Sequence, residues 1–379
     1  MSLESEIHNS LILLFLCLII GLILLQFILI IIRFRFFWKD FKTDSTQELP
    51  LVSVLISLRN EQDDLPGLLC ALANLDYPKD KLQILFADDQ STDHTNAILL
   101  DACKEYSNYK IIRISDSQMQ LFSQNGKANA LAILSAQATG SYYFFTDGDC
   151  RPGVQWIKEG VSCFDGSVGM VLGITQVESA NYSDRFQELD WWNTLGFVKV
   201  ATDVGMPTTG LGNNMVVSSE AYWESGGFQS IKVSLTEDLE LSRAIQKVGF
   251  EVAHQVSAGM LVRTRPEVTF LDLARQRKRW MSGVMSLPWY WLLLLSLQFW
   301  YFIAAASLFF FNPWIVILPA ALKVVLQSIF LRMFARRAGA QLPWLPLLLF
   351  DFYYFVTSAL TILYYFWPSP VIWKSRSYP

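Results

Sequence analysis

The sequence predicts an α/β domain with a mostly parallel sheet and helices on both faces, with transmembrane α-helices at both ends. Two observations support this fold class. Between residues 50 and 283, short apolar runs of strand length alternate with segments of helical periodicity. Long apolar runs lie on either side of that region. We therefore expect an N-terminal membrane anchor and linker over residues 1–49, the α/β domain over residues 50–283, and a C-terminal membrane region with a short tail over residues 284–379.

The composition agrees with a membrane location and argues against a nucleic-acid partner. Hydrophobic residues make up 52% of the 379-residue chain and charged residues 17%, which is more apolar than a typical soluble domain. The formal net charge of -4 provides no overall basic field that would attract nucleic acid. The five cysteines form no Cys-x-x-Cys pair, so we expect reduced thiols in a reducing compartment.

The first membrane segment is the apolar run Leu11–Ile32, which has the length of a bilayer span. Basic residues follow this run, whereas in a signal peptide they would precede it, so we expect an uncleaved anchor. The basic residues after the run are Arg33, Arg35, Lys39 and Lys42. By the positive-inside rule they place the following domain in the cytoplasm. We expect an integral protein of a bacterial inner membrane.

Three further apolar segments follow the α/β domain and are candidate spans. They are Leu287–Phe311, Trp314–Arg332 and Leu345–Trp367. Lys323 and Asp351 lie inside two of them, where a charge either has a function or faces a neighbouring helix or the interface. Three spans after a cytoplasmic domain would leave the basic tail at 373–376 outside, against the positive-inside rule. The alternative is that one segment lies in the membrane interface, and the Trp-rich stretch Leu287–Trp300 is the best candidate.

The elements of the α/β domain follow in order after a linker at Thr43–Glu48. The expected strands are Leu51–Ser57, Leu82–Ala87, Ile111–Ile114 and Tyr142–Thr146. The expected helices between them are Asp63–Leu75, Asn96–Lys104 and Lys127–Ala138. Strand–helix–strand alternation implies a parallel sheet, and such sheets bind ligands at the carboxyl ends of their strands.

Acidic pairs stand directly after two of these strands. Asp88 and Asp89 follow one strand, and Asp147-Gly148-Asp149 follows another. Either pair alone is explained by an ordinary turn or helix cap, because Asp-Gly turns and capping acids are common. Placed together at one edge of a parallel sheet, they predict a site for a metal-bound phosphate substrate, since hard cations prefer carboxylate oxygens.

In these segments the chain resembles family 2 glycosyltransferases of the GT-A fold, over roughly residues 50–280. Val52–Glu61 is similar to the family's first strand and nucleotide loop. Asp88–Thr95 resembles its Asp-Asp-x-Ser-x-Asp-x-Thr signature, with Gln90 where Gly or Asn is commoner, and Asp147–Asp149 resembles its DxD motif. The resemblance implies a nucleotide-sugar donor and a divalent cation, Mg²⁺ or Mn²⁺.

The resemblance also implies roles for the acidic residues. Asp149 would be the metal ligand, and Asp147 would contact the ribose or the metal. Asp88 and Asp89 would bind the nucleotide, with Asp89 at the base. Lys127 begins a helix, where a cation opposes the helix dipole, so we expect it to contact the diphosphate of the donor.

A third acidic pair, Glu237-Asp238, stands at the expected start of a helix. Thr236 as the cap, with acids in the first turn, is an ordinary helix N-terminus. The pair also resembles the family's Glu-Asp motif, which implies that Asp238 is the catalytic base with Glu237 beside it. A base that takes the proton of the acceptor hydroxyl during direct displacement would invert the anomeric configuration.

The last motif, Gln276-Arg277-Lys278-Arg279-Trp280, resembles the family's Gln-x-x-Arg-Trp box. In isolation, a basic cluster beside a membrane segment is the commoner explanation. The resemblance implies catalytic roles for Gln276, Arg279 and Trp280. Arg279 would hold the leaving diphosphate of the nucleotide sugar, and Trp280 would line the acceptor pocket.

Three weaker features complete the sequence. Gly210–Met215 resembles the family's acceptor-side loop, and the tail at 373–376 resembles a Trp-Lys-Gly-Arg ending with Ser375 in place of Gly. We expect His254, which lies in a probable strand, to be structural.

We therefore expect an inverting, metal-dependent glycosyltransferase. It would transfer a sugar from a nucleotide-sugar donor to a lipid, lipid-linked or glycan acceptor at the cytoplasmic face of the membrane. A processive polysaccharide synthase is the first alternative, although about three later segments are few for a polymer channel. A catalytically inactive assembly subunit is the second alternative, and the intact acidic positions argue against it.

Overall fold

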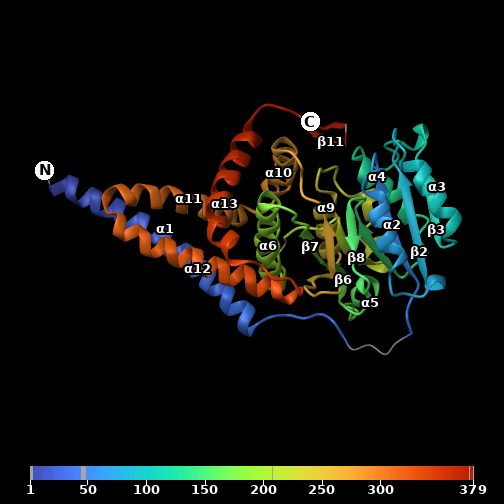
Figure 1. Ribbon diagram of the computed structural model, residues 1–379, viewed down its shortest axis with the longest axis horizontal. Helices are drawn as coiled ribbons and strands as arrows, with labels where there is room; N and C mark the ends of the chain where they lie inside the picture. Colours follow the sequence, from blue (N-terminus) through green and yellow to red (C-terminus); the bar gives the residue numbers. More distant parts are fainter. Residues whose placement is uncertain (1–2, 44–47, 207, 375, 379) are drawn as a thin grey trace.

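The structure, a computed structural model, describes residues 3–43, 48–206, 208–374 and 376–378. Figure 1 shows the α/β domain at one end of an elongated molecule and a group of long helices at the other. The N-terminal helix α1 (Leu3–Phe36) extends to the end farthest from the domain. Most of the linker expected at Thr43–Glu48 lies outside the described residues.

The main sheet has seven strands in the order β3-β2-β1-β4-β8-β6-β9. The strands are β1 (Val52–Leu58), β2 (Leu82–Asp88), β3 (Tyr109–Arg113), β4 (Tyr142–Thr146), β6 (Val168–Leu172), β8 (Asn214–Ser218) and β9 (Glu251–His254). β1 pairs in parallel with β2 and β4, whereas β8 is antiparallel to β4 and β6. The sheet is therefore mostly parallel, as expected, and β2 and β4 end at the same edge on either side of β1.

Two small sheets border the main one. β5 (Cys150–Pro152), β10 (Leu261–Thr264) and β7 (Ile174–Val177) form a sheet in the order β5-β10-β7. β5 begins directly after Asp149 and pairs with β10, so that Cys150 lies opposite Thr264. Near the C-terminus, β11 (Val371–Trp373) and β12 (Arg376–Tyr378) form an antiparallel hairpin.

Helices cover both faces of the main sheet because alternate residues of β1 point to opposite sides. Val54 and Ile56 belong to a core with α2 (Leu65–Ala73), α3 (Thr95–Glu105) and α5 (Trp156–Val161). Leu55 belongs to a second core with α4 (Gly126–Ser135), α7 (Ser219–Glu224), α8 (Gly227–Ser230) and α9 (Glu237–Lys247). The expected layer of helices on each face is confirmed.

Local boundaries agree with the expected ones to within a few residues, but two details of the helix starts differ. α4 begins one residue early, at Gly126, and is capped by the side chain of Asn125, which accepts from the amides of Lys127 and Ala128. Thr236 precedes α9 but makes no side-chain cap hydrogen bond. All five cysteines are free thiols.

Two amphipathic helices, α6 (Tyr182–Asp203) and α10 (Phe270–Met285), lie between the α/β domain and the long apolar helices (Figure 1). Leu189, Trp192 and Leu195 of α6 are buried in one cluster with residues of α1 and of the C-terminal helices. Through α6, the α/β domain thus packs directly against the long apolar helices.

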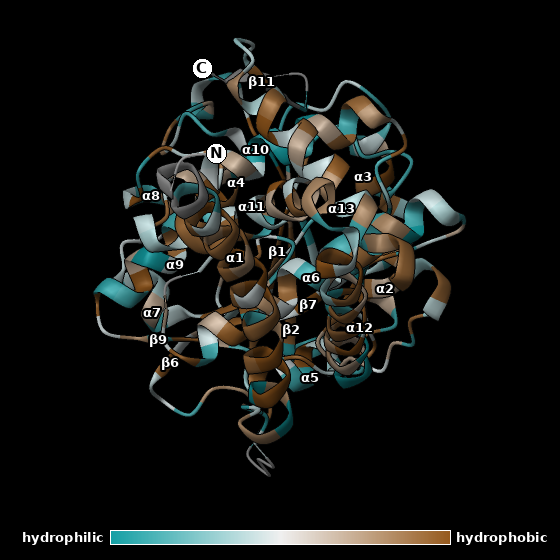
Figure 2. Ribbon diagram, turned by 90° about the vertical axis from the view of Figure 1, so that its left-hand side faces the viewer, coloured by the Kyte–Doolittle hydropathy of each residue, from teal (hydrophilic) through white to brown (hydrophobic). Residues whose placement is uncertain are grey.

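Four helices of the described chain are long and apolar enough to cross a membrane. They are His8–Phe36 within α1, α11 (Trp289–Phe311), α12 (Pro313–Arg337) and α13 (Trp344–Phe366). α1, α11 and α12 pack against one another, and Figure 2 shows the apolar character of α1 along most of its length. Lys323 of α12 pairs with Asp351 of α13 and lies 4.6 Å from the ring centroid of Tyr301, so this charge faces its neighbouring helices.

α13 differs from the other three in direction. In Figure 1 it crosses the base of the α1–α11–α12 group, beside α6 and α10, and it packs against both. The ammonium of Lys278 in α10 donates hydrogen bonds to the carbonyls of Trp367 (2.9 Å) and Ser369 (2.8 Å) just after α13. α10 therefore holds the end of α13 in place.

The chain then returns to the α/β domain, where the ammonium of Lys374 lies 2.5 Å from Oε1 of Glu61. This contact places the tail beside the α/β domain. Most of the stretch expected in the membrane interface, Leu287–Trp300, forms the first half of α11, which packs against α1.

Candidate active site

Asp147 and Asp149 line a cavity of about 1390 Å³ at the carboxyl edge of the main sheet. They follow β4, and Asp89, which follows β2, lines the same cavity. The glycine between the two acids is sterically required. A Cβ at Gly148 would lie 2.7 Å from Cδ2 of Leu58 and 2.8 Å from Cγ of Glu61.

Asp88 lies beneath this edge and does not line the cavity. Its side chain is fully buried, with Oδ1 accepting from the backbone amide of Ser91 and Oδ2 from the side-chain amide (Nδ2) of Asn96, both at 2.9 Å. The expected direct contact between Asp88 and the nucleotide is therefore not what the structure provides. Asp88 instead supports the loop that carries Asp89.

Lys127 extends from the first turn of α4 to the acidic residues. Its ammonium lies 2.5 Å from Oδ1 of Asp147 and 3.5 Å from Oε1 of Glu237, and the Lys127 and Glu237 side chains are 8% and 4% exposed. Burial acts to lower the pKa of Lys127, but the Asp147 and Glu237 carboxylates outweigh burial and raise it. Lys127 thus stays protonated, and its ammonium connects the DxD turn to the start of α9.

Asp238 stands at the start of α9, opposite the loop Gly210–Gly212, and both line the cavity. Its Oδ2 accepts a hydrogen bond from the amide of Gly212 at 2.9 Å. Gly210 packs so closely that a Cβ there would lie 2.3 Å from the carbonyl oxygen of Asp238. The loop therefore fixes the orientation of the Asp238 carboxylate.

The donor set around Asp149 fits a divalent cation. Burial raises the pKa of Glu61 to about 7, Lys374 opposes this rise, and the nearby Asp149 and Asp147 add to it. Carboxylate oxygens such as those of Asp147 and Asp149 are the ligands that Mg²⁺ or Mn²⁺ prefers. Within the described ranges, no group of three or more His, Cys, Asp or Glu side chains is placed so that it could hold a metal ion by itself. Donor phosphate oxygens would have to complete the coordination.

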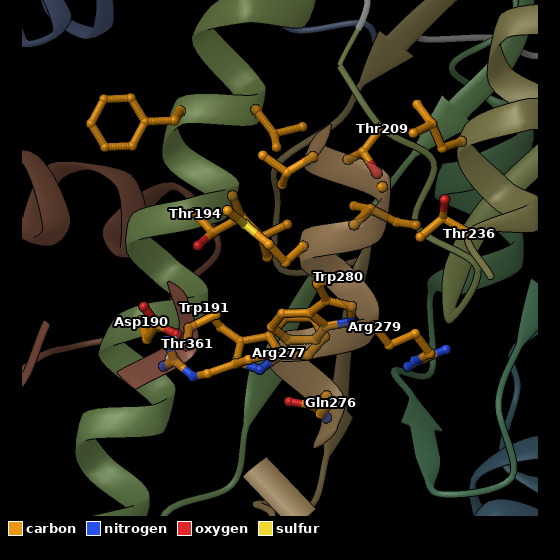
Figure 3. Close-up of a pocket in the computed structure, with 18 of the residues that line it drawn as sticks. Asp190, Trp191, Thr194, Thr209, Thr236, Gln276, Arg277, Arg279, Trp280 and Thr361 are labelled. Carbon is orange, nitrogen blue, oxygen red and sulfur yellow. Dashed lines mark hydrogen bonds and ion pairs between the residues drawn. The ribbon is translucent and has the colours of Figure 1, made fainter. Parts of the chain in front are cut away.

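The residues of the Gln-x-x-Arg-Trp box face different partners. Gln276 donates to Oε1 of Glu267 at 2.7 Å, and Arg277 forms a buried ion pair with Asp190 of α6 at 2.5 Å. Figure 3 shows Arg277 directed toward Asp190, whereas Arg279 leaves α10 on a different side. Arg277 is therefore paired with α6, although it lines the same cavity as Gln276.

The second half of the box lines the cavity. Arg279 and Trp280 are both lining residues. The Trp280 ring packs edge-on against Trp191 of α6, with centroids 5.1 Å apart and planes at 84° (Figure 3). Gln276 lines the cavity as well, so the three residues expected at the site are all brought to it.

Three lining residues close to the acids were not assigned a role at the site from the sequence. Arg59 donates from one guanidinium nitrogen to the carbonyl of Asp89 (2.7 Å) and from Nε to the carbonyl of Lys374 (3.1 Å). Glu61 pairs with Lys374. Arg59 and Glu61 lie in the segment matched to the nucleotide loop, so a signal existed for them. Nothing local indicated that Lys374 would meet residues more than 300 positions away.

The cavity continues from the acidic wall to the apolar helices. On that side it is lined by Trp191 and Leu195 of α6, Leu295 and Phe299 of α11, and Phe355 and Ile362 of α13. The lining is therefore charged at the sheet edge and apolar between the long helices. One continuous space can hold a polar reactant and a long apolar chain together.

A solved glycosyltransferase shares this architecture. The mannosyltransferase PcManGT from Pyrobaculum calidifontis, solved in complex with GDP-Man and Mn²⁺, matches with a TM-score of 0.58 and 17% identity over 94% of this chain and 98% of that one. The fold is accordingly GT-A, and the class expected from the motifs is confirmed. The chain belongs to glycosyl transferase family 21, whose family model matches residues 13–379, where the motifs had suggested family 2.

Curated relatives agree with this class. Glycosyltransferase AglE of Haloferax volcanii is 31% identical over 145 residues, which cover 37% of this chain and 45% of the relative. The beta-monoglucosyldiacylglycerol synthase of Synechocystis is 27% identical over 252 residues, which cover 63% of this chain and 49% of the relative. The chain spans about half the length of the curated relatives it matches.

Proposed function

We propose that this chain transfers a sugar from a nucleotide-sugar donor to a hydroxyl group of a membrane lipid or lipid-linked acceptor. The observation that carries the proposal is the single cavity that begins at Asp147 and Asp149 and ends among apolar residues of α11 and α13. The name of the Synechocystis relative contains a glycosylated diacylglycerol, which supports a lipid acceptor.

The donor would bind at the charged end of the cavity. Asp89 would contact the base, and Asp147 and Asp149 would hold the divalent cation. A cation bound there would neutralise the charge that develops on the departing diphosphate. Lys127, expected from the sequence at the diphosphate, is paired with Asp147 and Glu237, so it would keep both carboxylates in position. Arg279 would bind the diphosphate as it leaves.

The acceptor hydroxyl would be activated by Asp238. Its carboxylate lines the cavity, and the Gly212 amide orients it. The carboxylate would take the hydroxyl proton as the oxygen attacks the anomeric carbon, and the bond to the diphosphate would break on the opposite face. Glu237, paired with Lys127, would hold the start of α9. Because one displacement occurs with one base, the product would have the inverted configuration.

The apolar end of the cavity would take the acyl or isoprenoid part of the acceptor. Trp280 and Trp191 pack edge-on and both line the cavity, and such an aromatic pair would suit the level of lipid headgroups. We propose that residues 50–283 form the catalytic domain, with residues 1–49 and 284–379 forming the membrane-associated parts.

For the membrane itself, we propose that α1, α11 and α12 cross the bilayer and that α13 lies in its interface. Arg33 and Arg35 end α1, and Arg336 and Arg337 end α12, so both ends would face the cytoplasm by the positive-inside rule. The catalytic domain and the tail would then lie on that same side, which agrees with the contact between Lys374 and Glu61. A bacterial inner membrane is the host we propose.

The full chain in lipid nanodiscs that contain diacylglycerol tests this function. It would be incubated with radiolabelled UDP- and GDP-sugars and with Mg²⁺ or Mn²⁺. We expect label in the organic extract, lost after EDTA treatment and lost in Asp149→Asn. Asp165→Asn, which changes an exposed carboxylate in a loop, is the matched control and should keep the activity.

Two outcomes would support the alternatives. Label in a long polymer that resists lipid extraction would indicate a processive polysaccharide synthase. Full biological activity of Asp238→Asn in cells, with no labelled product from any donor, would indicate an assembly subunit.

A further inference from the structure

The C-terminal tail forms part of the wall of the donor site. Lys374 lines the cavity together with Arg59, Asp147 and Asp149. Its ammonium lies 2.5 Å from Glu61, and its side chain is 32% exposed while that of Glu61 is 6% exposed. The Lys374 side chain is therefore held on one side and accessible from the cavity on the other.

We propose that Lys374 is a donor-binding residue, whose ammonium contacts the diphosphate of the nucleotide sugar. The inference rests on the proposed function, because it assumes that a nucleotide sugar binds at this edge. It assigns to the tail a part in the reaction that the acidic motifs alone do not supply.

The first argument is how the tail is held. The guanidinium of Arg59 donates to the carbonyl of Lys374 and also to the carbonyl of Asp89. One side chain therefore fixes both the nucleotide loop and the tail. On the other side, Lys278 of α10 binds the carbonyl of Ser369. These contacts place Lys374 relative to the donor site from two directions.

The second argument is the backbone of Lys374, which has a φ of 46°. A residue with a Cβ adopts this left-handed region at a cost of about 1–2 kcal/mol. Such strain persists only where surrounding contacts determine it, and it is frequent at ligand-binding positions. Here Arg59 binds the carbonyl and Glu61 binds the ammonium of the same residue.

The third argument is the balance of charge. Lys127 already serves two carboxylates, Asp147 and Glu237, and is buried. An ammonium has three N–H donors, and Glu61 accepts one of those of Lys374. A diphosphate bound beside Asp147 and Asp149 needs cationic side chains in the cavity lining that are not already paired with these carboxylates. Lys374 can supply one without leaving Glu61.

The test measures binding of nucleoside diphosphates to the full-length protein in detergent, by calorimetry with Mn²⁺ present. The ligands are UDP and GDP, with UMP and GMP as the comparison. We expect Lys374→Met to weaken diphosphate affinity about 10-fold, as for loss of a charge-assisted hydrogen bond, and to change monophosphate affinity little. Lys374→Arg should restore most of the affinity. Lys232→Ala, an exposed lysine outside the cavity, is the control.

Two results would overturn the inference while leaving the proposed function intact. One is unchanged diphosphate affinity in Lys374→Met. The other is an equal loss for diphosphates and monophosphates, or a loss that Lys374→Arg does not restore, which would mean that Lys374 only holds the tail in place. If the unmodified protein binds neither UDP nor GDP at any metal concentration, the proposed function fails first and the inference falls with it.

Discussion

The amide of Gly212 donates a hydrogen bond to Oδ2 of Asp238 at 2.9 Å, so a glycine loop aims the carboxylate at the start of α9. The Leu239 amide donates to the other oxygen at 2.8 Å. These two hydrogen bonds fix the direction of the Asp238 carboxylate. A fixed direction is a requirement of a base that must meet one particular hydroxyl.

We therefore expect Asp238→Asn to retain donor binding but to lose transfer. The amide has the same shape but cannot accept the acceptor proton, and loss of general base catalysis typically lowers the rate by about 100- to 10,000-fold. Sugar transfer to lipid and calorimetric donor affinity are the two measurements. Glu240→Gln on the same helix, where Glu240 pairs with Arg243, should leave both unchanged. Normal transfer by Asp238→Asn would assign the base elsewhere.

Gly210→Ala tests the loop without touching a charged group. The added methyl group would lie 2.3 Å from the Asp238 carbonyl, so the loop or the helix start must move. We expect transfer to fall roughly 10- to 100-fold, since misplacement of a catalytic group by about 1 Å has effects of that size, while donor affinity stays near normal. Gly21→Ala is the control, because a methyl group there meets nothing within 4 Å. Equal effects of the two changes would argue against the loop's role.

Lys127→Met removes the cation between Asp147 and Glu237. Leaving a buried carboxylate such as Glu237 without its partner destabilises a protein by roughly 3–5 kcal/mol, so we expect a lower unfolding midpoint and weak donor binding. The control is Lys104→Met, which breaks an exposed pair with Asp101 whose side chains are 78% and 76% exposed. Such pairs contribute less than about 1 kcal/mol. If the thermal midpoint fell equally in both variants, the buried ion pairs of Lys127 would not stabilise the protein more than an exposed pair does.

His254 gives a pH dependence of stability. It is fully buried, and neither ring nitrogen has a hydrogen-bond partner within the described part of the chain. Burial, and then the Lys199 cation, lower its pKa to about 3 from the usual 6.5. As the pH falls below 6.5 the unfolded chain binds a proton that the folded chain cannot, so stability falls progressively between about pH 6.5 and 3.

His254→Phe removes that titration at no cost in hydrogen bonds. We expect the variant to lose less stability than the unmodified protein when the pH is lowered from 7 to 4, measured as the shift in thermal midpoint in detergent. The exposed His94, changed to Gln, should reproduce the unmodified pH profile. A variant profile that parallels the unmodified one would show that other groups cause the acid sensitivity. The same burial supports the structural role expected for His254.

The elements that depend on local pattern were predictable. The β-branched run of β1 and the apolar spacing of α2 are local signals, and the acids after β2 and β4 follow from the rule for parallel sheets. The different positions of Asp88 and Asp89 were harder to predict. The two residues are neighbours at the end of the same strand. Only the hydrogen bonds of Asp88 with Ser91 and Asn96 show that Asp88 is the one that does not face the cavity.

Long-range contacts account for what the sequence could not provide. Lys374 and Glu61 are 313 positions apart, and the pair forms only because α13 crosses the base of the helix group and returns the chain to the domain. Both α12 and α13 are long and apolar enough to cross a membrane, so the different direction of α13 could not be predicted from that criterion. Asp190 was missed for a similar reason, because an acid in an amphipathic helix is ordinary until Arg277 is found beside it.

The short connection between α10 and α11 has a consequence for product size. α10 carries Arg279 and Trp280 and ends at Met285, and α11 begins at Trp289. If α11 crosses the bilayer as proposed, this connection would hold the reacting centre at a fixed height above the hydrocarbon. A hydroxyl carried directly above lipid chains would reach Asp238 at that height. Once a sugar is attached, the next hydroxyl would stand too high, and the product could leave only sideways into the leaflet. The geometry alone would then limit the enzyme to the transfer of one sugar for each acceptor that binds.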